Sequence, residues 1–337
     1  MTVEAPSALL FAPPESQGLG CAIGEASGLP LAALEAREFE DGEFKLRPMV
    51  SVRNRSVFVI QTLAPSPERA TADRLVRLLF LLSALRDGGA AQVTAVIPYL
   101  AYARKDRRTQ PRDPIHTRYV AQLLESAGID RLLAVDVHNP AALDNAFRVG
   151  VDHLSALPMF AAQFSRRLHA SDPVIASPDV GGIKRAQILC ELMQVRLGHP
   201  IELAFLEKRR AGGIARTGAV VGAVGGRPVL LLDDLCASGG TLRRAAESLR
   251  SAGASAVHVA VTHAPNPAGL RAALQSEYIS DLTVTDTVGT DLGQRVGAMP
   301  GRLEILPIAP LLGAVIRRPL HGATVAELLE QAPAELP

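Results

Sequence analysis

The stretch Val229–Thr241, with the sequence VLLLDDLCASGGT, determines how the rest of the chain is interpreted. Its apolar start is typical of a buried strand, and its Gly-containing turn leads into a helix predicted for Thr241–Ser251. Two adjacent carboxylates, Asp233 and Asp234, stand at the end of the strand. In open α/β sheets, ligands bind at the carboxyl ends of the strands. The segment therefore predicts a binding site at the edge of a parallel sheet.

The loop after the two carboxylates has the composition of a phosphate-binding loop. Its residues are small enough to expose backbone N–H groups, which can hold a phosphate together with the helix N-terminus and two hydroxyls; they are Ala237, Ser238, Gly239, Gly240 and Thr241. Asp233 and Asp234 suit the hydroxyls of a bound ribose phosphate. The alternative is a plain strand–turn–helix connection capped by Ser238 or Asp234. Two carboxylates ending a buried strand are costly without a ligand or cation.

The pattern of apolar residues predicts an α/β protein with two units. Short strand-like runs alternate with amphipathic helical segments in the first part; they are 56–61, 70–86, 92–98, 117–126 and 131–136. The same order restarts at 172–177 and continues with 182–193, 201–206, 219–224, 228–233, 241–251, 255–262 and 281–284. We expect domains at 1–150 and 151–320, each a largely parallel sheet flanked by helices, and a peripheral tail at 321–337.

Composition excludes several classes of protein. A chain of 337 residues favours two domains. A formal net charge of +1 does not favour a nucleic-acid partner, and no apolar run is long enough to span a membrane. Three scattered cysteines, Cys21, Cys190 and Cys236, indicate neither a disulfide framework nor a zinc site. With no secretory signal at the N-terminus, we expect a cytoplasmic protein.

Five further motifs combine charged residues with strand ends or glycine. They are FEDGE at 39–43, IPYLAYARKDR at 97–107, AVDVH at 134–138, SPDVGGIKR at 177–185 and FLEKRR at 205–210. Taken alone, each has a bland interpretation, such as an acidic turn, a solvated basic loop or a helix start. Taken in this order and with the first stretch, they resemble the motifs of ribose-phosphate pyrophosphokinases, from about residue 35 to about residue 315.

The resemblance implies a fold, an activity and partners. The fold would be two tandem domains like those of type I phosphoribosyltransferases, with ATP on the first and ribose 5-phosphate on the second. The activity would transfer pyrophosphate from ATP to the 1-hydroxyl of ribose 5-phosphate, giving phosphoribosyl diphosphate and AMP. Mg²⁺ would be the cofactor, and the chain would form a homo-oligomer, usually a hexamer in this family.

The resemblance also implies roles for individual residues. Arg104 and Lys105 would contact ATP, and His138 with Asp179 would hold Mg²⁺. Asp233 and Asp234 would bind the sugar hydroxyls, and residues 237–241 the 5-phosphate. One further group would reach the ATP site of a neighbouring subunit, and it consists of Asp41, Gly42 and Glu43. Lys208 and Arg210 would contact the transferring phosphates. Residues 211–222 lack an apolar period, which predicts a loop that closes over the substrates.

The chain departs from the family pattern at two places, and two alternative functions remain. Lys105 stands where the family usually has Gln, and Ala237 stands where it has Asp, with Ser238 in place of Thr. The loss of a carboxylate at Ala237 favours one alternative, a non-catalytic regulatory paralogue of the enzyme. The other alternative is a phosphoribosyltransferase acting on a base, against which the FEDGE and YARKDR motifs argue.

Overall fold

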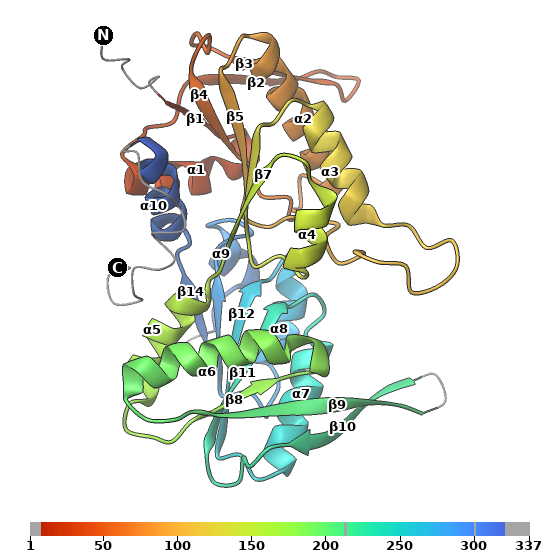
Figure 1. Ribbon diagram of the computed structural model, residues 1–337, viewed down its shortest axis with the longest axis vertical. Coiled ribbons are helices and arrows are strands. Elements are labelled where there is room, and N and C mark those ends of the chain that lie inside the picture. Colours follow the sequence, from red (N-terminus) through yellow and green to blue (C-terminus); the bar gives the residue numbers. More distant parts are fainter. Residues whose placement is uncertain (1–7, 212–213, 300, 321–337) are drawn as a thin grey trace.

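The computed structural model describes residues 8–211, 214–299 and 301–320 and contains two parallel sheets, one above the other in Figure 1. The upper sheet has, in spatial order, β1 (Leu9–Phe11), β4 (Ser56–Ile60), β5 (Gln92–Ile97), β6 (Arg131–Val135) and β7 (Gly150–Leu154). The lower sheet has β10 (Ile214–Val221), β9 (Glu202–Ala211), β8 (Val174–Ser177), β11 (Pro228–Leu235), β12 (Ala256–His263), β13 (Asp281–Thr285) and β14 (Leu303–Leu306). Only the β9–β10 pair of these two sheets is antiparallel.

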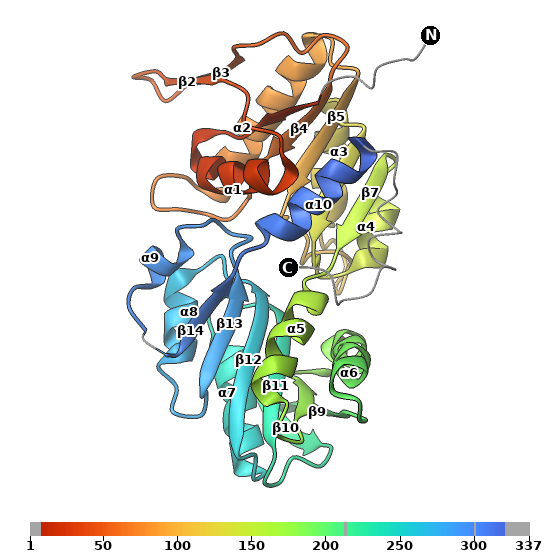
Figure 2. The same cartoon turned by 90° about the vertical axis from the view of Figure 1, so that its left-hand side faces the viewer.

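Helices cover both faces of each sheet. On the upper sheet, α2 (Thr71–Asp87) and α3 (His116–Ser126) lie on one face, and α1 (Gln17–Ser27) and α10 (Ala309–Leu320) lie on the other (Figure 2). On the lower sheet, α5 (Leu157–Leu168) and α6 (Ile183–Leu197) lie opposite α7 (Gly240–Ser251) and α8 (Pro267–Leu274). The short helices are α4 (Pro140–Ala146), α9 (Leu292–Val296) and two 3₁₀ turns, Pro14–Ser16 and Val180–Gly182. None of the helices in the described part of the chain is long and apolar enough to cross a bilayer.

The strands are buried because apolar residues occupy both of their faces. In β11, Leu230 and Leu232 pack toward α5 and α6, whereas Val229 and Leu231 pack toward α7 and α8. A continuous apolar run is what a parallel strand covered by helices on both faces requires. The fold class predicted from this pattern, an α/β protein with two parallel sheets, is confirmed.

The two units share one apolar cluster. It runs from α1 and α10 on the upper sheet to α5 and α6 on the lower sheet. The chain ends its described part with α10, which returns from the lower sheet to pack against α1 (Figure 2). This contact is close, because a Cβ on Gly313 would lie 2.5 Å from the Cβ of Ala26.

The prediction that residues 211–222 form a loop is wrong. Residues 214–221 form β10, which pairs with β9 in a hairpin that projects from the lower sheet (Figure 1). The hairpin forms through backbone hydrogen bonds between two strands, and these need no apolar alternation in the sequence. Residues 212 and 213, and the predicted tail at 321–337, lie outside the described residues.

Gly313→Ala should destabilise the protein by about 1–3 kcal/mol, because the added methyl group would overlap Ala26 and force α10 away from α1. Denaturant unfolding measures this change. Gly225→Ala is the matched control, since a Cβ there meets nothing within 4 Å. Equal stability of the two variants would contradict the close packing of α10 on α1.

Candidate active site

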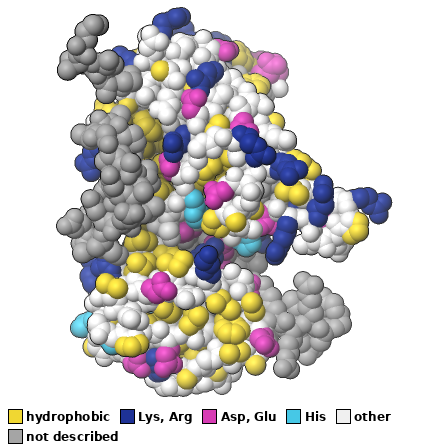
Figure 3. Space-filling view, in the orientation of Figure 1, with side chains coloured by type: hydrophobic (Ala, Val, Ile, Leu, Met, Phe, Trp, Pro, Cys, Tyr) yellow, Lys and Arg dark blue, Asp and Glu magenta, His cyan; other side chains and the backbone are white. Residues whose placement is uncertain are grey.

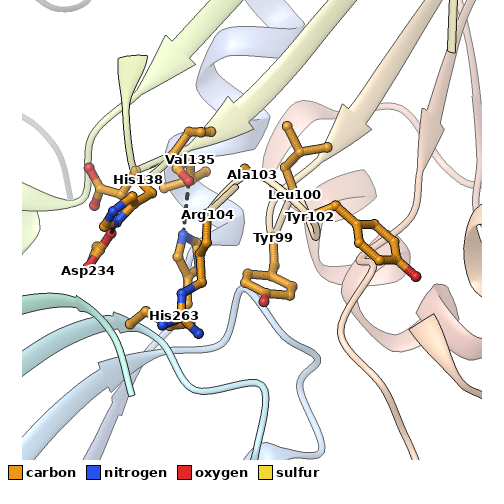
Figure 4. A pocket seen from close by; sticks show the side chains of 12 residues that line it. Tyr99, Leu100, Tyr102, Ala103, Arg104, Val135, His138, Asp234 and His263 are labelled. Atoms are coloured by element: carbon orange, nitrogen blue, oxygen red, sulfur yellow. Dashed lines mark hydrogen bonds and ion pairs between the residues drawn. The ribbon is translucent and has the colours of Figure 1, made fainter. Parts of the chain in front are cut away.

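A pocket lies between the two sheets, where the carboxyl ends of their central strands point toward each other. Its wall is formed by residues 99, 100 and 102–104 after β5, residues 135–138 at the end of β6, residues 234 and 235 at the end of β11, and His263 at the end of β12. Figure 4 shows these side chains around the pocket. Both units therefore contribute to one site.

The contact between His138 and Asp234 crosses from the upper unit to the lower unit. His138 Nδ1 lies 2.7 Å from Asp234 Oδ2, and Arg185 Nη2 lies 3.5 Å from the same oxygen. The hydrogen bond to Asp234 raises the pKa of His138. Burial by itself would raise the pKa of Asp234, but the hydrogen bond from His138 and the charge of Arg185 hold it well below its usual range. Asp234 is therefore an ionised carboxylate in a largely buried position.

Asp233 has the opposite electrostatic environment. Burial, and then the negative charge of Asp234, raise its pKa well above the usual value. Its Oδ1 accepts a hydrogen bond from the backbone N–H of Asp234 at 2.9 Å. Adjacent carboxyl groups with separated pKa values can play different roles in one site, one accepting hydrogen bonds as an anion and one donating as an acid.

The small-residue loop after β11 is packed against α8. Gly239 has φ of 71° and precedes α7, and neither Ser238 nor Asp234 caps this helix. The capping alternative is therefore not what the structure shows. A Cβ on Gly269 of α8 would lie 2.1 Å from the carbonyl oxygen of Ala237. The backbone of the loop therefore packs directly against α8 at Gly269, where no side chain would fit.

The loop between β5 and α3 carries a group of cations, which Figure 3 shows on the projecting right-hand side. Arg104 lines the pocket. Lys105 forms an ion pair with Asp113. Asp113 also accepts hydrogen bonds from the backbone and hydroxyl of Thr109, at 2.9 and 2.8 Å. The ion pair with Lys105, followed by these hydrogen bonds, holds the pKa of Asp113 well below its usual range.

The FEDGE motif forms the turn between β2 (Leu34–Glu38) and β3 (Phe44–Pro48), a hairpin that projects from the molecule (Figure 2). The backbone N–H of Glu43 donates to Asp41 Oδ1 at 3.0 Å, and the N–H of Gly42 donates to the carbonyl of Phe39 at 3.1 Å. Asp41, Gly42 and Glu43 are exposed and do not line the pocket of their own chain.

The predicted metal residues lie on different units. Asp179 follows β8 and accepts a hydrogen bond from the N–H of Gly182 at 3.2 Å, which caps the 3₁₀ turn. Gly182 packs closely here, because a Cβ would lie 2.4 Å from Ser177 Oγ and would displace that hydroxyl. Within the described residues, no three His, Cys, Asp or Glu side chains are grouped as a metal site. Lys208 and Arg210 stand in β9, opposite Thr217 and Ala215, and their side chains lie outside the described part.

Among the pocket residues with polar side chains, sequence reasoning missed Tyr99, Tyr102 and His263, whereas Asp136 belongs to the AVDVH motif that was expected to end at the site. Tyr102 and Asp136 have φ of 64° and 37°, values that cost energy for residues other than glycine and that concentrate at functional sites. Asp136 and His263 are almost fully buried. Their position at strand ends, next to motif residues, was the available signal.

The fold and the pocket define a protein of the phosphoribosyltransferase type with two units. A family model described as the N-terminal domain of ribose phosphate pyrophosphokinase matches residues 8–128, and a phosphoribosyl transferase domain model matches residues 154–286. A ribose-phosphate pyrophosphokinase of Granulibacter bethesdensis is 38% identical over 310 residues, which cover 92% of this chain and 96% of that protein. One from Maricaulis maris is 36% identical over 313 residues, covering 93% and 96%.

A solved structure gives the same result. The crystal structure of phosphoribosylpyrophosphate synthetase from Mycobacterium smegmatis is similar with a TM-score of 0.83 and 32% sequence identity, covering 94% of this chain and 100% of that one. The chain belongs to the ribose-phosphate pyrophosphokinase family.

A thiol-reactive disulfide reagent at pH 8 should modify only Cys21 in the native protein, because Cys21 is exposed. Burial raises the pKa of Cys190 to about 11 and that of Cys236 to about 12, so neither is a thiolate at this pH. Absorbance titration should count one thiol in the native protein and three in denaturant. Fast modification of Cys236, which borders the small-residue loop after β11, would contradict the packing described for β11.

Proposed function

We propose that this chain catalyses the transfer of pyrophosphate from ATP to the 1-hydroxyl of ribose 5-phosphate. The observation that carries the proposal is the single pocket to which Arg104 and His138 of one unit and Asp234 of the other contribute. Such a pocket can bring two phosphorylated substrates together, each held by its own unit. The family's named activity supports this directly.

The ribose 5-phosphate side would use the end of β11 and the following loop. Asp233 and Asp234 would bind the sugar hydroxyls, since a carboxyl pair with separated pKa values offers both an acceptor and a donor. Residues Ala237, Ser238, Gly239, Gly240 and Thr241 would bind the 5-phosphate through backbone N–H groups and the N-terminus of α7. This mode of binding does not depend on a carboxylate at position 237.

The ATP side would use the basic loop and a second subunit. Arg104 already lines the pocket, and Lys105 would bind a phosphate after leaving Asp113. Asp41, Gly42 and Glu43 would reach the ATP site of a neighbouring subunit, which fits their position on a projecting hairpin. This arrangement requires an oligomer, and we propose a homohexamer in the cytoplasm. We also propose domains at 1–150 and 151–320.

His138 and Asp179 are suited to Mg²⁺ bound with a substrate. Mg²⁺ in such sites uses one or two protein ligands, phosphates and waters. A metal-bound histidine usually donates a hydrogen bond from its other ring N–H, often to a carboxylate. His138 Nδ1 contacts the carboxylate of Asp234 in this way. When bound, the ion would neutralise phosphate charge. Magnesium and these ligands are our proposal.

The chain's own groups would act by positioning and by charge. Phosphoryl and pyrophosphoryl transfer needs alignment of the two substrates and stabilisation of charge on the transferring group. Lys208 and Arg210 of β9 would provide this charge. A regulatory paralogue would not need an ionised Asp234 held by His138 and Arg185, and no observation favours a transferase acting on a base.

The test of the proposed function is AMP formation by purified protein with ATP, Mg²⁺ and ribose 5-phosphate. Sugar-dependent AMP is expected, and omission of ribose 5-phosphate is the control. Lys208→Ala should fold normally and lose most turnover, by roughly 10²–10³-fold. No AMP from the wild-type protein would overturn the proposal and would direct attention to Ala237, Lys105 and the regulatory alternative.

Asp234→Asn should lower kcat/KM for ribose 5-phosphate by roughly 10²-fold. It removes the carboxylate that holds His138 and that would accept a hydrogen bond from a sugar hydroxyl. Steady-state AMP assays measure this change. Asp172→Asn is the matched control, since Asp172 is an exposed carboxylate paired with Arg227 at the other end of the sheet. Equal activity of both variants would refute the role of Asp234.

Asp113→Asn should lower the KM for ATP by at most about 5-fold, because it frees Lys105 for a phosphate. Lys105→Gln should raise the KM for ATP by a similar factor. Asp113 and ATP would compete for the ammonium group of Lys105, which is why the two variants should change the KM for ATP in opposite directions. A higher KM in both variants would instead show that Lys105 only braces the loop.

A further inference from the structure

His263 is buried at the end of β12, and both of its ring nitrogens have partners. Nε2 lies 3.0 Å from the carbonyl oxygen of Val135, and Nδ1 lies 2.8 Å from Thr287 Oγ1. A carbonyl oxygen only accepts, so Nε2 carries the proton that is donated to Val135. The hydroxyl of Thr285 donates separately to the carbonyl of Thr262 at 2.7 Å. The ring is held between these two partners, with its Nε2–H directed at Val135.

One residue thereby contacts both segments that carry the cross-unit pair. The ring of His263 holds Val135, three residues before His138, and Figure 4 draws this hydrogen bond. The carbonyl of His263 accepts from the N–H of Cys236 at 2.8 Å, two residues after Asp234. His263 therefore links the segment that carries His138 to the segment that carries Asp234, through its side chain and its main chain.

The neighbouring residue on β12 makes a second hydrogen bond to the end of β6, with the donor again on β12. Thr262 Oγ1 donates to Asp136 Oδ2 at 2.7 Å. Asp136, with its φ of 37°, is also held by Ser155 Oγ and the N–H of Ala156, both at 3.0 Å. A strained backbone of this kind persists only where its surroundings fix it. The end of β12 is thus joined to the end of β6 by two hydrogen bonds, both donated by side chains of β12.

We infer that His263 is a positioning residue for the reaction, which holds the His138 segment of the upper unit in register with Asp234 of the lower unit. The inference rests on the proposed function. The groups assigned to ATP lie mainly on the upper unit, and those assigned to ribose 5-phosphate lie on the lower one. Loss of the ring contact should therefore impair alignment of the two substrates more than binding of either, so that kcat falls and KM values change little.

The test compares three variants by AMP formation. His263→Leu should lower kcat by about 10²-fold with KM values within about 3-fold of the wild type, since misplacement of about 1 Å has that cost. His263→Gln should restore most of kcat, because its amide N–H can donate to Val135. His258→Gln is the matched control: His258 stands on the same strand, bonded to Asp281 at 2.7 Å, and its replacement should leave kcat unchanged. A folded His263→Leu variant with wild-type kcat would overturn the inference.

A crystal structure of His263→Leu provides a readout that is independent of activity. The 2.7 Å contact between His138 and Asp234 should be broken there and retained in His263→Gln. An intact contact in His263→Leu would overturn the inference even if the wild-type protein forms no AMP, which is the separate failure of the proposed function. Should His263→Leu not fold, Thr287→Val removes the hydroxyl that contacts Nδ1 of the His263 ring and the carbonyl of Thr262. Its kcat should fall by about tenfold, and an unchanged kcat would overturn the inference.

Discussion

The hydrogen bond between His138 and Asp234 is the interaction on which the architecture of the site depends. It joins residues that are 96 positions apart and that belong to different sheets. Asp234 is largely buried, and an ionised carboxylate in such a place needs partners that compensate for its lost hydration. His138 and Arg185 supply them. The pocket exists as one site because this compensation comes from both units.

The sequence predicted the parts of the fold that depend on local patterns. The apolar runs of β4 and β11 are continuous because both faces of each strand are covered, and such runs identify parallel strands. Parallel strands place their carboxyl ends at one edge of a sheet, so Asp234 and His138 could each be expected at an edge. The two edges face each other because of contacts between segments that are far apart in the sequence. Local sequence patterns carry no information about such contacts.

The parts that were missed have physical reasons. The hairpin of β9 and β10 is held by backbone pairing, so its sequence of 214–221 lacks the alternation that marks a half-buried strand. His263 was missed because its partners, Val135 and Thr287, are far from it in sequence. The roles given to Lys208 and Arg210 stay predictions, since their side chains lie outside the described residues.

The two departures from the family pattern have different structural settings. Lys105 adds a positive charge, and Asp113 neutralises it within the same loop. Ala237 removes a carboxylate, but the loop backbone is fixed by the approach of its carbonyl to Gly269 and by the left-handed Gly239. Backbone N–H groups are what a phosphate needs from such a loop. Both substitutions are therefore compatible with an intact site.

A double-mutant cycle on His138 and Asp234 tests the central claim that the two units form one site through this pair. The quantity is kcat/KM for AMP formation in His138→Ala, Asp234→Asn and the double variant. Groups in direct contact show strong coupling, so the double variant should be about as active as the worse single variant. If the two single losses multiply in the double variant, the residues act independently and the account is wrong.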